Sequence, residues 1–214
     1  MLVRVIVTRP EDQAEELAAG LRALGHEVVV CPLVRVKPLG DEPIDASAYD
    51  WAIVTSANGA RELARRLTGR PRRFAAVGRA TAAALAEHGL IADLVPAVAT
   101  QEGLLAELPR PAGRVLVAAA AGARRLLVDE LEADFLPLYR TIGLRPEEPP
   151  EGDLVVLASG SAARAFATLG LDLPAVSIGP QTTAAARAAG VRIVAEAPTH
   201  DVAGLLNVIA RLGP

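Results

Sequence analysis

The sequence repeats itself in the order A, B, A′, B′, and this repeat limits the folds that the chain can adopt. Residues 50–67 (DWAIVTSANGARELARRL) align with 153–170 (DLVVLASGSAARAFATLG), and residues 78–89 (GRATAAALAEHG) align with 179–190 (GPQTTAAARAAG). Each aligned segment contains or follows a short apolar run, turns at a Gly or Ser, and continues with an Ala-rich helical pattern. We name the first pair of modules B and its later copy B′.

The other segments form a fainter pair, A and A′. Residues 2–36 are similar to residues 112–142, because RVIV matches RVLV and PLVRV matches PLYRT. Across the whole chain, compact runs of Val, Ile, Leu and Ala predict strands, most of them followed by a helical Ala/Leu period. These strands are expected at 4–8, 27–33, 51–56, 74–78, 94–96, 114–119, 135–139, 154–159, 175–179 and 192–197. Such alternation is typical of parallel sheets covered by helices on both faces.

Two segments rich in Pro, Gly and acidic residues, 35–47 and 140–152, interrupt the alternation directly after the matched PLVRV and PLYRT runs. We therefore expect two flavodoxin-like parallel-sheet α/β domains, one made of A with B′ and the other of B with A′. The matched runs would pair as a two-stranded linker. The expected boundaries are 1–34 with 150–214, 40–139, and linkers at 35–39 and 140–149. The alternative is an old duplication within a single sheet.

Composition excludes several classes of protein. The net charge of −3 argues against a general nucleic-acid binder. Cys31 is the only cysteine, so an intrachain disulfide and a thiolate metal cluster are excluded. His26, His88 and His200 lack the spacing of metal ligands, and we expect surface or turn positions for them. We expect neither a metal nor an organic cofactor.

The N-terminal apolar run is too short for a signal peptide, and no stretch approaches the length of a membrane span. We therefore expect a cytoplasmic protein without membrane contact. Since the sequence has no evident apolar stripe for dimerisation, a monomer is expected. Lys37 is the only lysine among the basic residues. Arginine binds carboxylates in a bidentate manner, although a GC-rich genome would produce the same bias.

Ligands of open parallel sheets bind beyond the carboxyl ends of the strands, where helix N-termini point. Small hydroxyl residues and one arginine follow the expected strands at this place: Thr8, Arg9, Ser56, Thr81, Ser159, Ser161, Thr182 and Thr183. Together they would offer many weak donors to a ligand with several carboxylates. The alternative for each hydroxyl is the ordinary role of an N-cap. No nucleotide-binding, serine-hydrolase or zinc-protease motif occurs.

Three further residues are candidates for a site. Tyr139 ends an expected strand beside the second linker, where the first copy has Val34. Its phenol could donate a proton or a hydrogen bond to a ligand, or it could simply pack. Arg124 and Arg125 are expected to open a helix, where they could bind carboxylates or lie on a solvated helix face.

An ordered set of motifs resembles the uroporphyrinogen-III synthase family. The set comprises VTRP near the start, D-x-x-x-x-T-S-A-N, V-G-x-x-T-A, the Y-R-T strand end, L-A-S-G-S, I-G-P-x-T-T-A and A-x-x-P-T, in the order of the family and over nearly the whole chain. The resemblance implies two α/β domains joined by a two-stranded linker, with the active cleft between them. It also implies that no cofactor is needed.

The resemblance further implies the reaction. The substrate would be hydroxymethylbilane, a linear tetrapyrrole with eight carboxylates, which is cyclised with inversion of ring D and loss of water. Departure of the hydroxyl gives an azafulvene cation, the substituted carbon of ring D attacks it to form a spiro-pyrrolenine, and this intermediate fragments and recloses. Ring closure without inversion occurs unaided, so the main task would be to position the chain.

The family motifs also imply roles for individual residues. Tyr139 matches the tyrosine that assists departure of the hydroxyl, in a supportive role. The hydroxyls of Ser56, Thr81, Ser159 and Thr182 match residues that line the cleft. Either Arg124 or Arg125 matches a basic position, and Asn58 stands where some members carry a basic residue. Two other classes remain as alternatives: a two-domain binding protein that closes on a small molecule without catalysis, and a nucleotide-binding regulatory protein.

Overall fold

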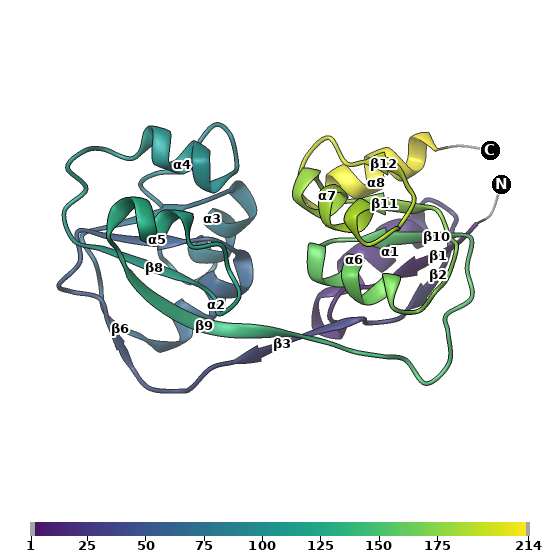
Figure 1. Ribbon diagram of the computed structural model, residues 1–214, viewed down its shortest axis with the longest axis horizontal. Helices are drawn as coiled ribbons and strands as arrows, with labels where there is room; N and C mark the ends of the chain where they lie inside the picture. The colour runs from purple at the N-terminus through teal and green to yellow at the C-terminus, as the bar shows by residue number, and fades with distance from the viewer. Residues whose placement is uncertain (1–2, 213–214) are drawn as a thin grey trace. The chain divides into compact units, whose positions relative to one another are not determined.

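The computed structural model describes residues 3–212, and their contacts divide them into two units (Figure 1). Unit 1 contains the described parts of Met1–Arg35 and Thr141–Pro214, and unit 2 is Val36–Arg140. Each unit has its own five-stranded, mainly parallel sheet with helices on both faces. The prediction of an α/β fold with two parallel sheets is therefore confirmed, and the alternative of a single sheet is wrong.

The sheet of unit 1 has the strand order β12-β11-β10-β1-β2, and all of its neighbouring strands run parallel. These strands are β1 (Arg4–Val7), β2 (Glu27–Val30), β10 (Leu154–Leu157), β11 (Ala175–Ser177) and β12 (Ile193–Glu196). The helices are η1 (Glu11–Gln13), α1 (Glu15–Ala23), α6 (Gly160–Ala167), α7 (Pro180–Ala188) and α8 (Val202–Arg211). This order is that of a flavodoxin-like sheet.

The central strands of the unit 1 sheet are buried on both faces, which explains why β10 and residues 5–7 of β1 are apolar throughout. In β1, Val5 and Val7 pack in one cluster with Leu17 of α1 and Leu205 of α8. Ile6, between them, points to the opposite face, where it packs in a second cluster with Phe166 of α6 and Ala186 of α7. Helices α1 and α8 therefore cover one face, and α6 and α7 cover the other.

The sheet of unit 2 has the strand order β3-β9-β8-β5-β7. Its strands are β3 (Val34–Pro38), β5 (Trp51–Val54), β7 (Arg73–Ala76), β8 (Val115–Ala120) and β9 (Asp134–Gly143), and β4 (Ile44–Asp45) pairs separately with β6 (Leu67–Gly69). The helices are α2 (Ala57–Arg66), α3 (Arg79–Ala86), α4 (Gln101–Glu107) and α5 (Leu126–Leu131). Helices α2 and α3 contribute to the cluster on one face, and α4 and α5 to the cluster on the other.

The two units share one arrangement, as the repeat predicts. Replacing each strand of unit 1 by its repeat partner gives Leu94, β7, β5, β8 and β9. The observed sheet of unit 2 has β7, β5, β8 and β9 in this order and adds β3 beside β9. The predicted strand at 94–96 is nevertheless wrong, because Leu94 makes only an isolated bridge to Ala75. Pro96 follows closely and has no N–H to donate, so a ladder cannot continue. Strands β4 and β6 were not predicted.

Strands β3 and β9 are hydrogen-bonded neighbours that contain both places where the chain passes from one unit to the other. The N–H of Leu39 donates to the carbonyl of Leu138, and the N–H of Leu144 donates to the carbonyl of Leu33, each at 2.8 Å. This pattern means that the two strands run antiparallel. They form the two-stranded linker that the matched PLVRV and PLYRT runs predict.

The aspartates that open both aligned segments have the same structural role. The Asp50 carboxylate accepts a hydrogen bond from the Arg114 N–H at 2.9 Å, and the Asp50 N–H donates to the Arg114 carbonyl at 2.8 Å. Asp153 forms the same reciprocal pair with Arg4, with both distances 2.8 Å. These aspartates therefore join the amino ends of two neighbouring strands, which explains why both copies carry them.

Candidate functional site

The candidate residues follow the carboxyl ends of the two sheets, and two of them cap helices there. Ser56 is the N-cap of α2, where its hydroxyl accepts a hydrogen bond from the Gly59 N–H at 3.0 Å. Ser159 occupies the same position before α6 and accepts from the Ala162 N–H at 3.1 Å. Both side chains are half-buried. Capping orients each hydroxyl at the end of its strand, and an oxygen that accepts from the helix can still donate its own proton.

Tyr139 lies in β9 beside Ala120, the last residue of β8, so that its ring belongs to the carboxyl end of the unit 2 sheet. It is 6% exposed and packs in the same cluster as Val54 and Leu63. The phenol oxygen lies 2.8 Å from the Ser56 hydroxyl oxygen. Burial raises the pKa of the Tyr139 phenol above its usual value, partly offset by the hydrogen bond with Ser56. The phenol therefore stays protonated at neutral pH.

Thr81 and Thr182 are equivalent in the repeat, and the structure places them equivalently. Each lies in the first turn of its helix, where its N–H donates at 3.0 Å to the carbonyl of the glycine that caps the helix. Both side chains are 5% exposed, and neither hydroxyl makes a hydrogen bond to another residue within the described range 3–212. Both hydroxyls therefore remain available as donors.

Thr8 and Thr183, by contrast, use their hydroxyls inside unit 1. The fully buried Thr8 donates to the Val156 carbonyl at 2.8 Å, which ties the end of β1 to β10. The Thr183 hydroxyl lies 2.5 Å from the hydroxyl of Ser177 and also donates to the carboxylate of Glu196. These contacts join the first turn of α7 to the ends of β11 and β12. The hydroxyls of both threonines therefore stabilise the carboxyl ends of the unit 1 strands through hydrogen bonds.

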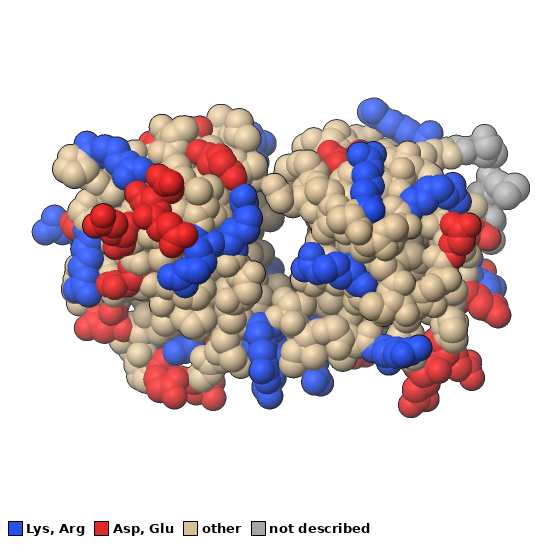
Figure 2. Space-filling model, viewed as in Figure 1, with Lys and Arg blue, Asp and Glu red and all other residues tan. Residues whose placement is uncertain are grey.

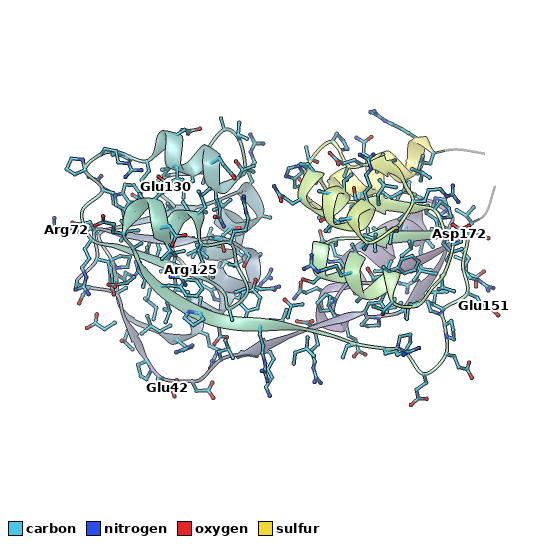
Figure 3. All side chains as sticks on the ribbon, viewed as in Figure 1. Glu42, Arg72, Arg125, Glu130, Glu151 and Asp172 are labelled. Atoms are coloured by element: carbon cyan, nitrogen blue, oxygen red, sulfur yellow. The ribbon has the colours of Figure 1, made fainter. Side chains whose placement is uncertain are left out.

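The basic candidates Arg124 and Arg125 lie directly before α5, with Arg125 as its N-cap residue, so they stand at the start of a helix as expected. Arg124 forms a bidentate ion pair with Glu102, at 2.7 and 3.2 Å. Hydrogen bonds from Arg124 lower the pKa of Glu102 to about 2. Arg125, labelled in Figure 3, stacks over the Phe135 ring at 4.8 Å and reaches Asp129 at 3.9 Å. A ligand carboxylate would compete with these partners.

The remaining candidates are half-exposed at the same edges: Arg9 after β1, Asn58 in the first turn of α2, and Ser161 in the first turn of α6. Each sheet thus brings its own candidates together at one end. Unit 1 contributes Thr8, Arg9, Ser159, Ser161, Thr182 and Thr183, and unit 2 contributes Ser56, Asn58, Thr81, Arg124, Arg125 and Tyr139.

Sequence reasoning missed two side chains at these edges. Arg79 is the exposed first residue of α3 and has no ion pair with another residue of the described chain. A cation is unfavourable at a helix N-terminus, and a bound anion would offset this cost. Arg79 is therefore a further candidate for binding an anion. His200 packs against Gly179, the N-cap of α7, so closely that a Cβ at Gly179 would lie 2.6 Å from its Cδ2. In the repeat, Ala99 contacts Gly78 in the same way.

No group of three or more His, Cys, Asp or Glu side chains with the arrangement of a metal site occurs among residues 3–212. None of the helices in that range is long and apolar enough to cross a membrane. Acidic and basic side chains alternate over the face of unit 2 drawn in Figure 2.

The fold and its polar edges define a two-domain α/β protein in which both sheets present hydroxyl groups, helix N-termini and arginines beyond their carboxyl ends. The model of the family described as "Uroporphyrinogen-III synthase HemD" matches residues 15–207. The chain therefore belongs to the uroporphyrinogen-III synthase family.

Individual relatives agree with this assignment. A uroporphyrinogen-III synthase of Synechococcus elongatus is 29% identical over 248 residues, which cover 96% of this chain and 93% of that protein. The porphyrin biosynthesis protein HemD of Ruminiclostridium josui is 30% identical over 92% of this chain and 46% of its own length. A crystal structure of a mutant uroporphyrinogen III synthase from Thermus thermophilus has a TM-score of 0.64 at 19% identity and covers 98% of both chains, which supports the fold.

Proposed function

We propose that the carboxyl ends of the sheets bind the substrate and that Tyr139 acts there as a proton donor. Membership of the family assigns the reaction: the chain converts hydroxymethylbilane to uroporphyrinogen III in tetrapyrrole biosynthesis, as a hydro-lyase. The match over residues 15–207 carries the assignment of the reaction. The buried hydrogen bond between Tyr139 and Ser56 is the observation that carries the assignment of the proton donor.

The proposed step begins with the hydroxymethyl group of the substrate. The electron-rich pyrrole expels the hydroxyl as its C–O bond breaks, and the Tyr139 phenol donates a proton so that water leaves. A proton released when the ring closes returns to the phenolate, so that the net change is the loss of one water. A phenol with a raised pKa suits this role because it stays protonated until the leaving group develops negative charge. Ser56 orients it at 2.8 Å.

The hydroxyls and helix N-termini position the substrate and take no part in bond breaking. Thr81 and Thr182 have donors that are not used within the described chain, and α3 and α7 direct their N-terminal N–H groups to the same edges. Each such contact to a carboxylate is weak, about 0.3–1 kcal/mol for a helix terminus. A substrate with eight carboxylates can engage many of them at once. Holding ring D over the azafulvene would then favour the inverted product.

The test is to supply hydroxymethylbilane and to identify the porphyrin isomer after oxidation. We expect the type III isomer in excess over the type I isomer that forms unaided. If only type I forms while the tetrapyrrole binds, the chain is a binding protein without catalysis. Tyr139→Phe is the companion variant, because unchanged turnover would contradict the role as proton donor. A monomeric state and a cytoplasmic location stay predictions, to be tested by sedimentation and by fractionation of cells.

A further inference from the structure

Two arginines that are equivalent in the repeat behave differently in the two units. Arg61 of α2 aligns with Arg164 of α6. In unit 2, the Nε of Arg61 lies 3.5 Å from a carboxylate oxygen of Glu87, the C-cap residue of the neighbouring helix α3. The Arg61 side chain therefore points toward the C-terminal end of α3, away from the edge that carries the candidate residues.

Unit 1 lacks the acid of this pair. The residue equivalent to Glu87 is Ala188, the last residue of α7, which packs on α6 as α3 packs on α2. Arg164 is exposed and forms no ion pair or hydrogen bond with another residue in the described range 3–212. Its Nη1 lies 3.4 Å from the position that a Cβ would take at Gly160, the first residue of α6. The guanidinium group therefore lies beside the start of its own helix, and position 188 offers it no acid.

The positive charge of Arg164 has no acidic partner among residues 3–212. The start of α6 follows β10, so the guanidinium lies at the carboxyl edge of the unit 1 sheet, beside the first residue of α6. The N-terminus of a helix carries a partial positive charge of its own. An arginine and this terminus repel each other weakly, and both are stabilised by the same anion. Guanidinium groups bind carboxylates in bidentate geometry, which favours a carboxylate as that anion.

We propose that Arg164 binds a carboxylate of the substrate at the carboxyl edge of unit 1. The inference rests on the proposed function, because it takes the tetrapyrrole polycarboxylate as the ligand. Arg164 is a substrate-binding residue in this proposal and takes no part in bond breaking. Position 188 has no acid to bind Arg164, whereas Glu87 binds Arg61.

The experiment compares steady-state KM and kcat for hydroxymethylbilane in matched variants. Arg164→Gln should raise KM about tenfold, in line with the loss of a charged hydrogen bond, while kcat changes less than twofold. Arg164→Lys keeps the charge but not the bidentate geometry and should raise KM less. Arg61→Gln is the control, since it removes an equivalent arginine that points away from the edge, and its KM should match that of the unaltered protein.

A second variant tests the reason for the difference between the units. Ala188→Glu rebuilds in unit 1 the ion pair that Arg61 and Glu87 form in unit 2, so it should engage Arg164 and raise KM without touching Arg164 itself. Ala188→Gln serves as its uncharged control and should leave KM unchanged. Position 188 is exposed, so both side chains fit.

The outcomes separate this inference from the proposed function. A KM for Arg164→Gln within twofold of the unaltered protein, with the type III isomer still formed, would overturn the role of Arg164 and leave the reaction intact. Formation of only the type I isomer by the unaltered protein would overturn the proposed function instead. Equal increases in KM for Arg164→Gln and Arg61→Gln would also contradict the inference, because they would indicate a general effect of lost charge.

Discussion

The phenol oxygen of Tyr139 lies 2.8 Å from the hydroxyl oxygen of Ser56, although 83 positions separate the two residues in the chain. Ser56 simultaneously accepts the N–H of Gly59 as the cap of α2. One hydroxyl therefore links the start of a helix to the proposed proton donor of the site. The stability of the helix start and the orientation of the phenol should respond to the same substitution.

Tyr139→Phe should lower kcat and leave the fold intact. The ring still fills its place in the core, while the proton donor is lost. We expect a decrease of about two orders of magnitude at most, the lower end of the range for a general acid, because the pyrrole itself can expel the hydroxyl. Burial raises the pKa of Tyr139 above the ordinary value near 10. The kcat of the unaltered protein should therefore show no decrease from loss of this proton between pH 6 and 9, whereas such a decrease, absent in Tyr139→Phe, would contradict the raised pKa of the phenol.

Ser56→Ala should lower both stability and kcat. Loss of the N-cap costs about 1 kcal/mol in the free energy of unfolding, measured by urea denaturation, and Tyr139 loses its hydrogen-bond partner. Ser159→Ala removes the equivalent cap of α6 and provides the matched reference for the stability effect. A kcat for Ser56→Ala equal to that of the unaltered protein would show that the phenol needs no orienting partner.

Neighbouring threonines of α7 should give opposite results. Thr183→Val leaves the fully buried Ser177 hydroxyl without its partner and should cost about 1–3 kcal/mol in the free energy of unfolding. Thr182→Val removes a hydroxyl with no partner within residues 3–212, so unfolding should change little while KM rises. Urea denaturation and steady-state kinetics on both variants check this pair, and the reverse assignment of the two effects would refute it.

Acid titration should reveal the ion pair between Glu102 and Arg124. Hydrogen bonds from Arg124 lower the pKa of Glu102 to about 2 in the folded protein. Since the folded pKa lies below the unfolded one, the stabilisation is present above about pH 4.5 and is lost as pH falls toward 2. Carbon NMR of the carboxyl group should give a midpoint near 2, and Arg124→Gln should return it toward the ordinary value. Arg125→Gln should leave it unchanged, and a normal midpoint in the unaltered protein would exclude the pair.

The repeat allowed much of the fold to be predicted, because local signals recur in both copies. Both Ser caps and both Gly-capped helices lie where the aligned segments place them. Gly89 and Gly190, which close the aligned segments, have φ values of 70° and 82°, a region that favours glycine. The strand order could be predicted less directly, and short strands such as β4 were missed because two residues carry no periodic signal.

The site was harder to predict, because it depends on which face of a helix a residue occupies and on what lies opposite. Thr182 and Thr183 are adjacent and of one type, yet only Thr183 meets Ser177 and Glu196. The availability of Arg164 depends on the residue at position 188 of another helix. Arg124 was predicted as a ligand for anions, but Glu102, 22 positions earlier, already binds it. Contacts of this kind become visible only when both elements are placed.

The discontinuous composition of unit 1 has a consequence for synthesis on the ribosome. Unit 2 is one uninterrupted segment that ends at Arg140, whereas β1 lies between β2 and β10, and β10 begins only at Leu154. One side of β1 therefore stays unpaired until β10 has been made. We expect nascent chains in which Arg140 has left the ribosome, but Leu154 has not, to protect Val36–Arg140 from protease while β1 and β2 are still digested.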